Sequence, residues 1–112
     1  KKVVCAVFTN RTSTMQLVLE HFNLAHYFDC VISASTVACS KPHPEGIFKI
    51  LRRWNLSARD VVFIGDSELD QKAASLSGVT FWSFKNFDLQ ADMYISDFDT
   101  LRVFLINNLN NR

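Results

Sequence analysis

Short apolar segments alternate along this chain with segments whose apolar residues recur at helical spacing, and that alternation restricts the possible folds most. The expected strands are Val3–Phe8, Cys30–Ile32, Val61–Ile64, Val79–Phe84 and Met93–Ile95. The expected helices run from Thr12 or Ser13 to Phe22, from Pro44 to Trp54, from Ser67 to the C-capping Gly78 and from Phe98 to Leu109. Continuously apolar strands indicate a parallel sheet with helices on both faces, a three-layer α/β/α, Rossmann-like fold.

The length and composition bound the class of protein. The 112 residues suffice for one domain, and 48% apolar with 21% charged residues is the composition of a folded globular protein. A net charge of +1 gives no support to nucleic-acid binding, and no apolar run approaches the roughly 20 residues of a membrane helix. Cys5, Cys30 and Cys39 lack metal-ligand spacing and are interpreted as reduced thiols. Since the N-terminus is also unlike a signal peptide, we expect a cytoplasmic protein.

Two acidic residues follow the clearest strand of the chain. Gly65, Asp66 and Ser67 come directly after Val61–Ile64, and Asp70 lies one helical turn further on. Ligands of such folds bind at the carboxyl ends of the strands, so both carboxylates are expected at one rim. Two adjacent carboxylates repel unless a cation lies near them, and hard oxygen ligands suit Mg²⁺. The alternative is that they only stabilise a helix N-terminus.

Two further segments place polar groups at the same rim. Thr9 and Asn10 follow the first expected strand and lead toward a helix N-terminus, where a hydroxyl, an amide and free N–H groups bind anions. Lys41 precedes Pro42 and the next helix, where it can neutralise phosphate and carboxylate charge together. Taken singly, these residues are equally compatible with turn chemistry and a solvated charge.

The order of these segments resembles the haloacid dehalogenase superfamily, in its phosphoglycolate phosphatase-like branch. VCAVFTN is similar to the second motif of that family, SKPHPEGIFKIL to the third and VVFIGDSELDQKAASLSGV to the fourth. HFNLAHYFDCVIS and ADMYISDFDTLRVFL fit the connecting and closing segments, so the resemblance extends over the whole chain.

The resemblance implies a phosphatase that works with Mg²⁺ through an aspartyl-phosphate on a small phosphorylated metabolite. It implies that Asp66 ligates Mg²⁺ and that Asp70 holds the ion directly or through water. Thr9 and Asn10 would bind the phosphate, and Lys41 would orient the nucleophile. Gly65 and Ser67 would support this site. The substrate stays open, as does the choice between phosphatase and phosphomutase chemistry.

The first motif of the family, which carries the nucleophilic Asp on a central strand, has no counterpart before Val3. Asp97 and Asp99 are no substitute, because Thr100 lies three residues after Asp97 rather than four, and one of the two, Asp97 or Asp99, is expected to cap the last helix. Residues 1–112 therefore resemble the C-terminal portion of a core domain, without the first strand and the cap domain. They would belong to a larger enzyme, form an inactive binding module or pseudoenzyme, or take the strand from another chain. With two strand edges unpaired, we expect the isolated residues to be poorly stable.

Other patterns lead to weaker hypotheses. A receiver domain of two-component signalling has a similar inventory of residues, but its acidic pair comes first and its Lys-Pro last. His21, His26 and His43 share no ligand spacing, and the basic cluster on the second helix is interpreted as a solvated face. Phe84–Phe87, which follows a strand, is a candidate wall of the site.

Overall fold

The computed structural model describes residues 4–11, 20–23, 26, 28–34 and 36–109, with side chains up to residue 107. Its strands are β1 (Ala6–Phe8), β2 (Cys30–Ile32), β3 (Val62–Gly65), β4 (Thr80–Phe84) and β5 (Met93–Ile95). Its helices are α2 (Glu45–Arg53), the 3₁₀ turn η2 (Ala58–Asp60), α3 (Glu68–Ser77) and α4 (Phe98–Leu109). Most of the helix expected to end at Phe22, including its caps Thr12 and Ser13, lies outside the described residues.

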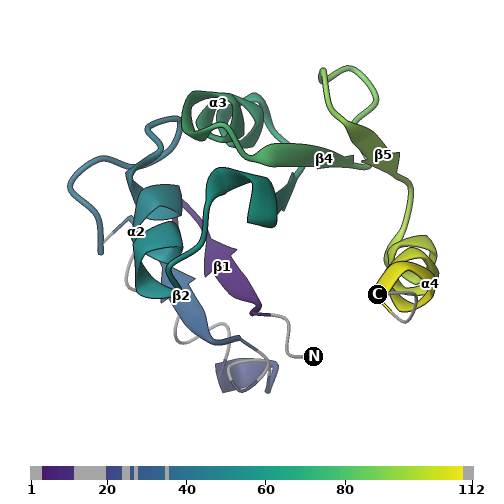
Figure 1. The fold of residues 1–112 in the computed structure, drawn as a ribbon, viewed down its shortest axis with the longest axis horizontal. Helices are drawn as coiled ribbons and strands as arrows, with labels where there is room; N and C mark the ends of the chain where they lie inside the picture. Colours follow the sequence, from purple (N-terminus) through teal and green to yellow (C-terminus); the bar gives the residue numbers. More distant parts are fainter. Residues whose placement is uncertain (1–3, 12–19, 24–25, 27, 35, 110–112) are drawn as a thin grey trace.

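All strand pairs between the described strands are parallel, as the apolar runs predict. β1 pairs with β2, so that Val7 lies opposite Val31. β4 pairs with β3 and with β5, which places Trp82 between Ile64 and Met93. The described strands therefore form two sheets, of order β1-β2 and β3-β4-β5 (Figure 1).

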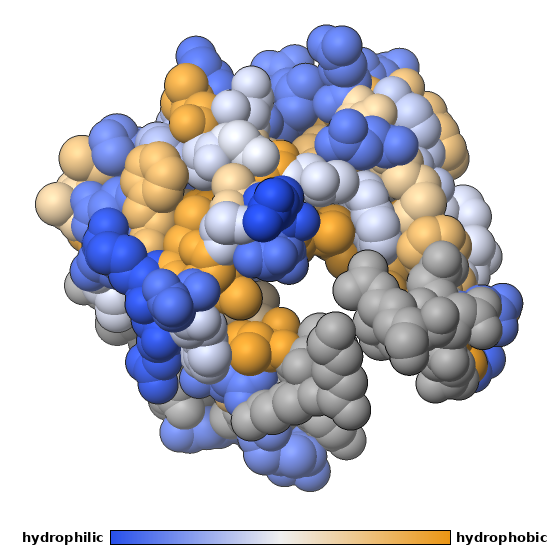
Figure 2. Space-filling view, in the orientation of Figure 1, coloured by the Kyte–Doolittle hydropathy of each residue, from blue (hydrophilic) through white to orange (hydrophobic). Residues whose placement is uncertain are grey.

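The two sheets lie edge to edge, and a cleft separates the edge strands β1 and β3. The rings of Phe8 on β1 and Phe63 on β3 stack at 5.7 Å between centroids, so the two edges are neighbours without strand pairing in the described part of the chain. Figure 2 shows this face hollowed near its centre, with hydrophobic surface above and to the left of the hollow. This division of the sheet agrees with the expected fold, an α/β sheet that lacks its central strand.

Helices lie on both sides of β4, which makes the three layers. On one side, Phe81 packs into a core with Ala73 and Ala74 of α3. On the other side, Trp82 meets Phe104 of α4 edge to face at 5.4 Å, and Phe84 stacks on Phe98 at 4.4 Å. α2 packs against β1 and α3, and its Ile47 completes the core (Figure 1).

The expectation that every strand is buried on both faces is wrong for β3. Phe63 packs against the core, but Val62 and Ile64 on the opposite face are 43% and 36% exposed. The cause is the position of α4, which packs on β4 and β5 and leaves this face of β3 uncovered.

Among the described residues, none of the helices combines the length and apolar character needed to cross a bilayer.

Local signals set the helix ends. Ser67 caps α3 in a capping box with Asp70, and Gly78 ends the same helix at φ 77°, a left-handed conformation that favours glycine. Asp97 accepts a hydrogen bond from the Thr100 N–H at 2.7 Å, which holds the pKa of Asp97 below its ordinary value. This confirms Asp97 as the cap of α4. Pro44 stands at the N-cap of α2, one position before the expected first turn.

Candidate functional site

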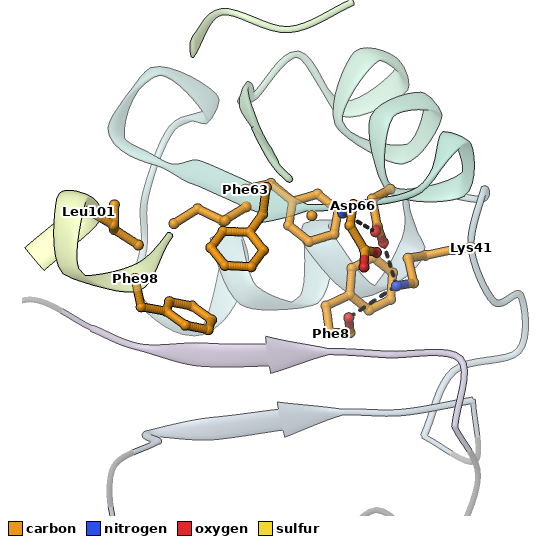
Figure 3. Close-up of a pocket in the computed structure, with 10 residues that line it drawn as sticks. Phe8, Lys41, Phe63, Asp66, Phe98 and Leu101 are labelled. Atoms are coloured by element: carbon orange, nitrogen blue, oxygen red, sulfur yellow. Dashed lines mark hydrogen bonds and ion pairs between the residues drawn. The ribbon is translucent and has the colours of Figure 1, made fainter. Parts of the chain in front are cut away.

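Lys41, Asp66 and Asp70 meet at the carboxyl end of the sheet, around a cleft of about 360 Å³. Lys41 comes from the loop that precedes α2, Asp66 follows β3, and Asp70 lies in the first turn of α3. Figure 3 shows Lys41 and Asp66 beside Phe8 at the end toward which β1 points, while Phe98 and Leu101 of α4 close the other end. The structure thus brings together residues that the sequence placed at one rim.

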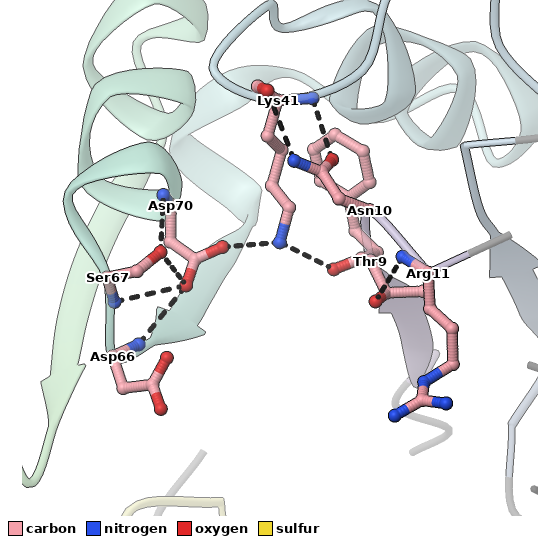
Figure 4. Close-up of polar contacts among 8 residues, drawn as sticks. Thr9, Asn10, Arg11, Lys41, Asp66, Ser67 and Asp70 are labelled. Carbon is pink, nitrogen blue, oxygen red and sulfur yellow. Dashed lines mark hydrogen bonds and ion pairs between the residues drawn. The ribbon is translucent and has the colours of Figure 1, made fainter.

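The ammonium group of Lys41 is held from several directions. Its Nζ lies 2.5 Å from Asp70 Oδ1 and donates to the carbonyl oxygen of Phe8 at 3.2 Å (Figure 4). It also lies over the rings of Phe8 and Phe63, 5.3 and 5.9 Å from their centroids, where the negative faces attract a cation. These contacts place the positive charge at the inner end of the cleft.

Asp70 is only 6% exposed, and its carboxylate accepts hydrogen bonds from several donors. While Oδ1 binds Lys41, Oδ2 accepts from the backbone N–H of Asp66 at 3.2 Å and of Ser67 at 3.3 Å, and from Ser67 Oγ at 3.0 Å. This explains the glycine before Asp66, because a Cβ on Gly65 would lie 2.5 Å from Asp70 Cβ and 2.6 Å from its Cγ. Asp70 therefore ties together the turn that carries Asp66.

The carboxylate of Asp66 is free of that network. Asp66 is exposed, and its carboxylate accepts no hydrogen bond from the described residues, whereas its backbone is fixed at both polar groups. Figure 4 shows this carboxylate turned away from Lys41 and Asp70. Among the predicted site residues, Asp66 is thus the one that offers both carboxylate oxygens to a metal ion, and Asp70 supports it from behind.

Thr9 and Asn10 lie at the end of β1, as predicted, but their side chains differ in availability. Thr9 Oγ1 accepts the N–H of Arg11 at 3.1 Å, which leaves its own hydroxyl hydrogen to be donated. The Asn10 amide is engaged on the backbone of Lys41, accepting from its N–H at 2.9 Å and donating to its carbonyl at 3.2 Å. Within the described part of the chain, the Thr9 hydroxyl thus has no acceptor for its hydrogen, and Asn10 holds the lysine loop.

Sequence reasoning included Asn86 only as part of the candidate wall Phe84–Phe87 and missed its specific role. Its Nδ2 donates to the carbonyl of Asp66 at 3.0 Å, while its Oδ1 accepts the N–H of Asp88 at 3.1 Å. The loop after β4 is thereby fastened to the turn that carries Asp66. The candidate wall Phe84–Phe87 is borne out in part, because Phe84 lines the cleft. The sequence signal was the position of Asn86 two residues beyond a strand end, where polar groups of such sheets gather.

Comparison with known proteins agrees with this geometry. The family model described as haloacid dehalogenase-like hydrolase matches residues 1–84. A phosphoglycolate phosphatase from Pasteurella multocida is 33% identical over 79 residues, which are 70% of this chain and 35% of that protein. The phosphoglycolate phosphatase of Escherichia coli K12 is 32% identical over 79 residues, 70% of this chain and 31% of its own length.

Solved structures share the fold over nearly the whole chain. A HAD-superfamily hydrolase of subfamily IA from Geobacter sulfurreducens has a TM-score of 0.87 at 37% identity, covering 92% of this chain and 53% of that one. A HAD phosphatase from Thermococcus onnurineus has a TM-score of 0.81 at 28% identity, covering 91% of this chain and 50% of its own.

A parallel sheet with this rim of lysine and aspartates, and a family model matching three quarters of the chain, define a haloacid dehalogenase-like hydrolase. The chain belongs to this family, and within it is similar to phosphoglycolate phosphatases. It spans about a third of the length of the curated relatives and about half of the solved structures it matches.

Proposed function

We propose that this chain forms part of a Mg²⁺-dependent phosphomonoester hydrolase that acts through an aspartyl-phosphate. The observation that carries the proposal is the arrangement at the rim, where the Lys41 ammonium group pairs with the engaged carboxylate of Asp70, and Asp70 in turn holds the turn that carries the available carboxylate of Asp66. Phosphoryl transfer needs positive charge and positioning more than covalent chemistry, and both are supplied here.

The donor set fits Mg²⁺ at Asp66. Exposed carboxylate oxygens, with room for water and for phosphate oxygens, are what Mg²⁺ requires. Asp66 would hold the ion directly, and Asp70 would act through the turn or through water, because its Oδ2 already accepts three hydrogen bonds. When bound, Mg²⁺ neutralises the charge that develops on the transferring phosphoryl group.

The remaining residues bind and orient. The free hydroxyl hydrogen of Thr9 would donate to a phosphate oxygen, and Lys41 would offset the charge of phosphate and nucleophile together. Asn10 would hold Lys41 in register and use its second Nδ2 hydrogen at the phosphate. Gly65 and Ser67 support Asp70 and so keep Asp66 in place.

The nucleophile would come from a strand that completes the sheet. Asp66 and Asp70 are the carboxylates that line the cleft, and both already have roles. We propose that a segment outside these 112 residues, of the same or another chain, pairs with β1 and β3 and presents an aspartate beside Lys41. The substrate would be a small phosphorylated metabolite, since the similar proteins are named phosphoglycolate phosphatases.

The test compares hydrolysis of p-nitrophenyl phosphate by the 112-residue chain and by a longer chain that includes the segment encoded upstream. We expect Mg²⁺-dependent turnover in the longer chain alone, abolished by Asp66→Asn. An inactive longer chain would contradict the phosphatase proposal, and activity of the short chain would contradict the external nucleophile.

A second candidate is a phosphate- and metal-binding module without catalysis. It is favoured by the engagement of Asp70, which leaves the described cleft without a carboxylate free to serve as nucleophile beside Lys41. Binding of inorganic phosphate and Mg²⁺ by a longer chain that hydrolyses no phosphomonoester would support this alternative.

A further inference from the structure

The loop that leads into α2 gathers a thiol, an imidazole and a carboxylate outside the cleft. Cys39, His43 and Glu45 offer ligand atoms that all lie within 4.8 Å of one another. Cys39 and His43 are exposed, and Glu45 is half-buried, so that an ion can reach the group from solvent. None of these residues lines the cleft that holds Asp66. We propose that they form a second metal site, selective for Zn²⁺ or a similar thiophilic divalent cation.

Glu45 organises this site through backbone contacts. Its Oε2 accepts the N–H of Ala38 and its Oε1 accepts the N–H of Cys39, both at 3.0 Å. These bonds fold the loop onto the first turn of α2 and bring the Cys39 side chain beside the carboxylate. Each carboxylate oxygen keeps a second lone pair for a metal.

His43 is held with an unprotonated nitrogen in the same loop. Its Nδ1 accepts the backbone N–H of Glu45 at 3.1 Å, so this nitrogen carries no hydrogen. Pro42 and Pro44 flank the residue and restrict its backbone. A cation bound at Nδ1 takes the place of that N–H, and loading therefore exchanges one neutral hydrogen bond for metal–ligand bonds.

The ligand chemistry selects the ion. A thiolate, an imidazole and a carboxylate suit Zn²⁺, whereas Mg²⁺ prefers oxygen ligands alone. On binding, the Cys39 thiol loses its proton to solvent and the sulfur becomes the ligand. Three protein ligands leave a fourth tetrahedral position for water. The chain would thus carry two cation sites of different selectivity, one at Asp66 and one in this loop.

The position of the second site relates it to Lys41. Cys39 and His43 stand two residues before and after the lysine, so that a bound ion would bridge the loop across the residue whose Nζ contacts Asp70. The lysine backbone is already held by Asn10. Occupancy would therefore add a second restraint on the loop.

Titration of the reduced longer chain (the form used in the hydrolysis test) with Co²⁺, followed by absorption spectroscopy, tests the site without reference to hydrolysis. We expect a sulfur-to-cobalt charge-transfer band and tetrahedral d–d bands at one Co²⁺ per chain. Zn²⁺ should remove these bands, and excess Mg²⁺ should leave them. Cys39→Ser should abolish the charge-transfer band, and His43→Ala should weaken binding by more than about tenfold.

Cys5→Ser is the matched control, because Cys5 is also an exposed free thiol. It should retain the full spectrum, as should Asp66→Asn, which separates this site from the proposed Mg²⁺ site. Circular dichroism confirms that each variant keeps its fold. Absence of a charge-transfer band at saturating Co²⁺, or a band that survives Cys39→Ser and is lost in Cys5→Ser, would overturn the proposal.

Discussion

The side-chain amide of Asn10 is paired with the backbone of Lys41 in both directions, at 2.9 Å to the N–H and 3.2 Å to the carbonyl. These residues are separated by 31 positions in the chain. The contact joins the end of β1 to the loop before α2, and the same lysine then reaches Asp70 at the start of α3. The position of Lys41 therefore depends on three segments: the end of β1, its own loop before α2 and the start of α3.

Replacing Asn10 separates positioning from substrate binding. Asn10→Ala removes two part-buried hydrogen bonds and should lower the free energy of unfolding by about 2 kcal/mol. In the longer chain, kcat should fall more than KM changes, because the loss acts through Lys41. Asn10→Asp keeps the acceptor for the Lys41 N–H and should be the milder variant. A raised KM for the phosphomonoester with unchanged kcat would instead show that the proposed phosphate contact of Asn10 outweighs its hold on Lys41.

The Lys41–Asp70 pair should show strong coupling in a double-mutant cycle. The two side chains are 11% and 8% exposed, so Lys41→Met leaves a buried carboxylate without its counter-charge. We expect a loss of about 3 kcal/mol in urea unfolding. Lys41→Met/Asp70→Asn should lose less than the sum of the single variants, because the second change removes the uncompensated charge. Additive losses would show that solvent already screens the pair.

Gly65→Ala should disturb the turn that carries Asp66, the proposed Mg²⁺ ligand, through sterics alone. The added Cβ would meet Asp70 at 2.5 to 2.6 Å, and overpacking of this kind costs about 2 kcal/mol. Because Asp70 holds the Asp66 N–H, the Mg²⁺ concentration at half-maximal activity of the longer chain should rise. Gly78→Ala is the matched control, since it strains a left-handed position at the far end of α3. It should lower stability and leave the Mg²⁺ response unchanged.

The helix cap at Asp97 predicts an acid-dependent loss of stability. The Thr100 N–H, as the largest cause, keeps the pKa of Asp97 below its ordinary value of 3.8. Because the pKa of Asp97 is lower in the folded state, its ionised carboxylate stabilises the fold at pH values above 3.8. This stabilisation disappears as the pH falls through the folded-state pKa. Asp97→Asn retains an acceptor without the charge, so its free energy of unfolding should depend less on pH in this range. Urea unfolding at a series of pH values measures the difference.

The cleft between β1 and β3 predicts how the isolated residues behave. Unpaired strand edges expose backbone N–H groups, so amides on the facing edges of β1 and β3 should exchange hydrogen faster than those of β4. We expect the 112-residue chain to associate at high concentration and to unfold at lower urea than the longer chain. A monomeric chain of equal stability in sedimentation and unfolding experiments would contradict this prediction.

Much of the fold was predictable because its signals are local. The bounds of β2, β5 and α4, the C-cap Gly78 and the cap Asp97 all follow from neighbouring residues in the chain. The exposure of Val62 and Ile64 was not predictable, because an apolar strand has the same pattern whether or not a helix covers it. The cover is decided by α4, which begins more than thirty residues later.

Local patterns in the sequence were enough to predict that Thr9, Asn10, Lys41, Asp66 and Asp70 lie at one rim, since each follows or precedes an element whose type is locally encoded. The hydrogen bonds that these side chains make became known only from the folded chain. Asp70 is committed to Lys41 and to the turn, Asp66 is free, and Asn10 holds a backbone rather than presenting an open amide. The proximity of the Cys39, His43 and Glu45 ligand atoms is likewise seen only in the structure. A hydrogen bond needs a partner at a definite distance and direction. The partner of a polar side chain therefore depends on which distant segments of the chain fold against it, and sequence spacing does not reveal this.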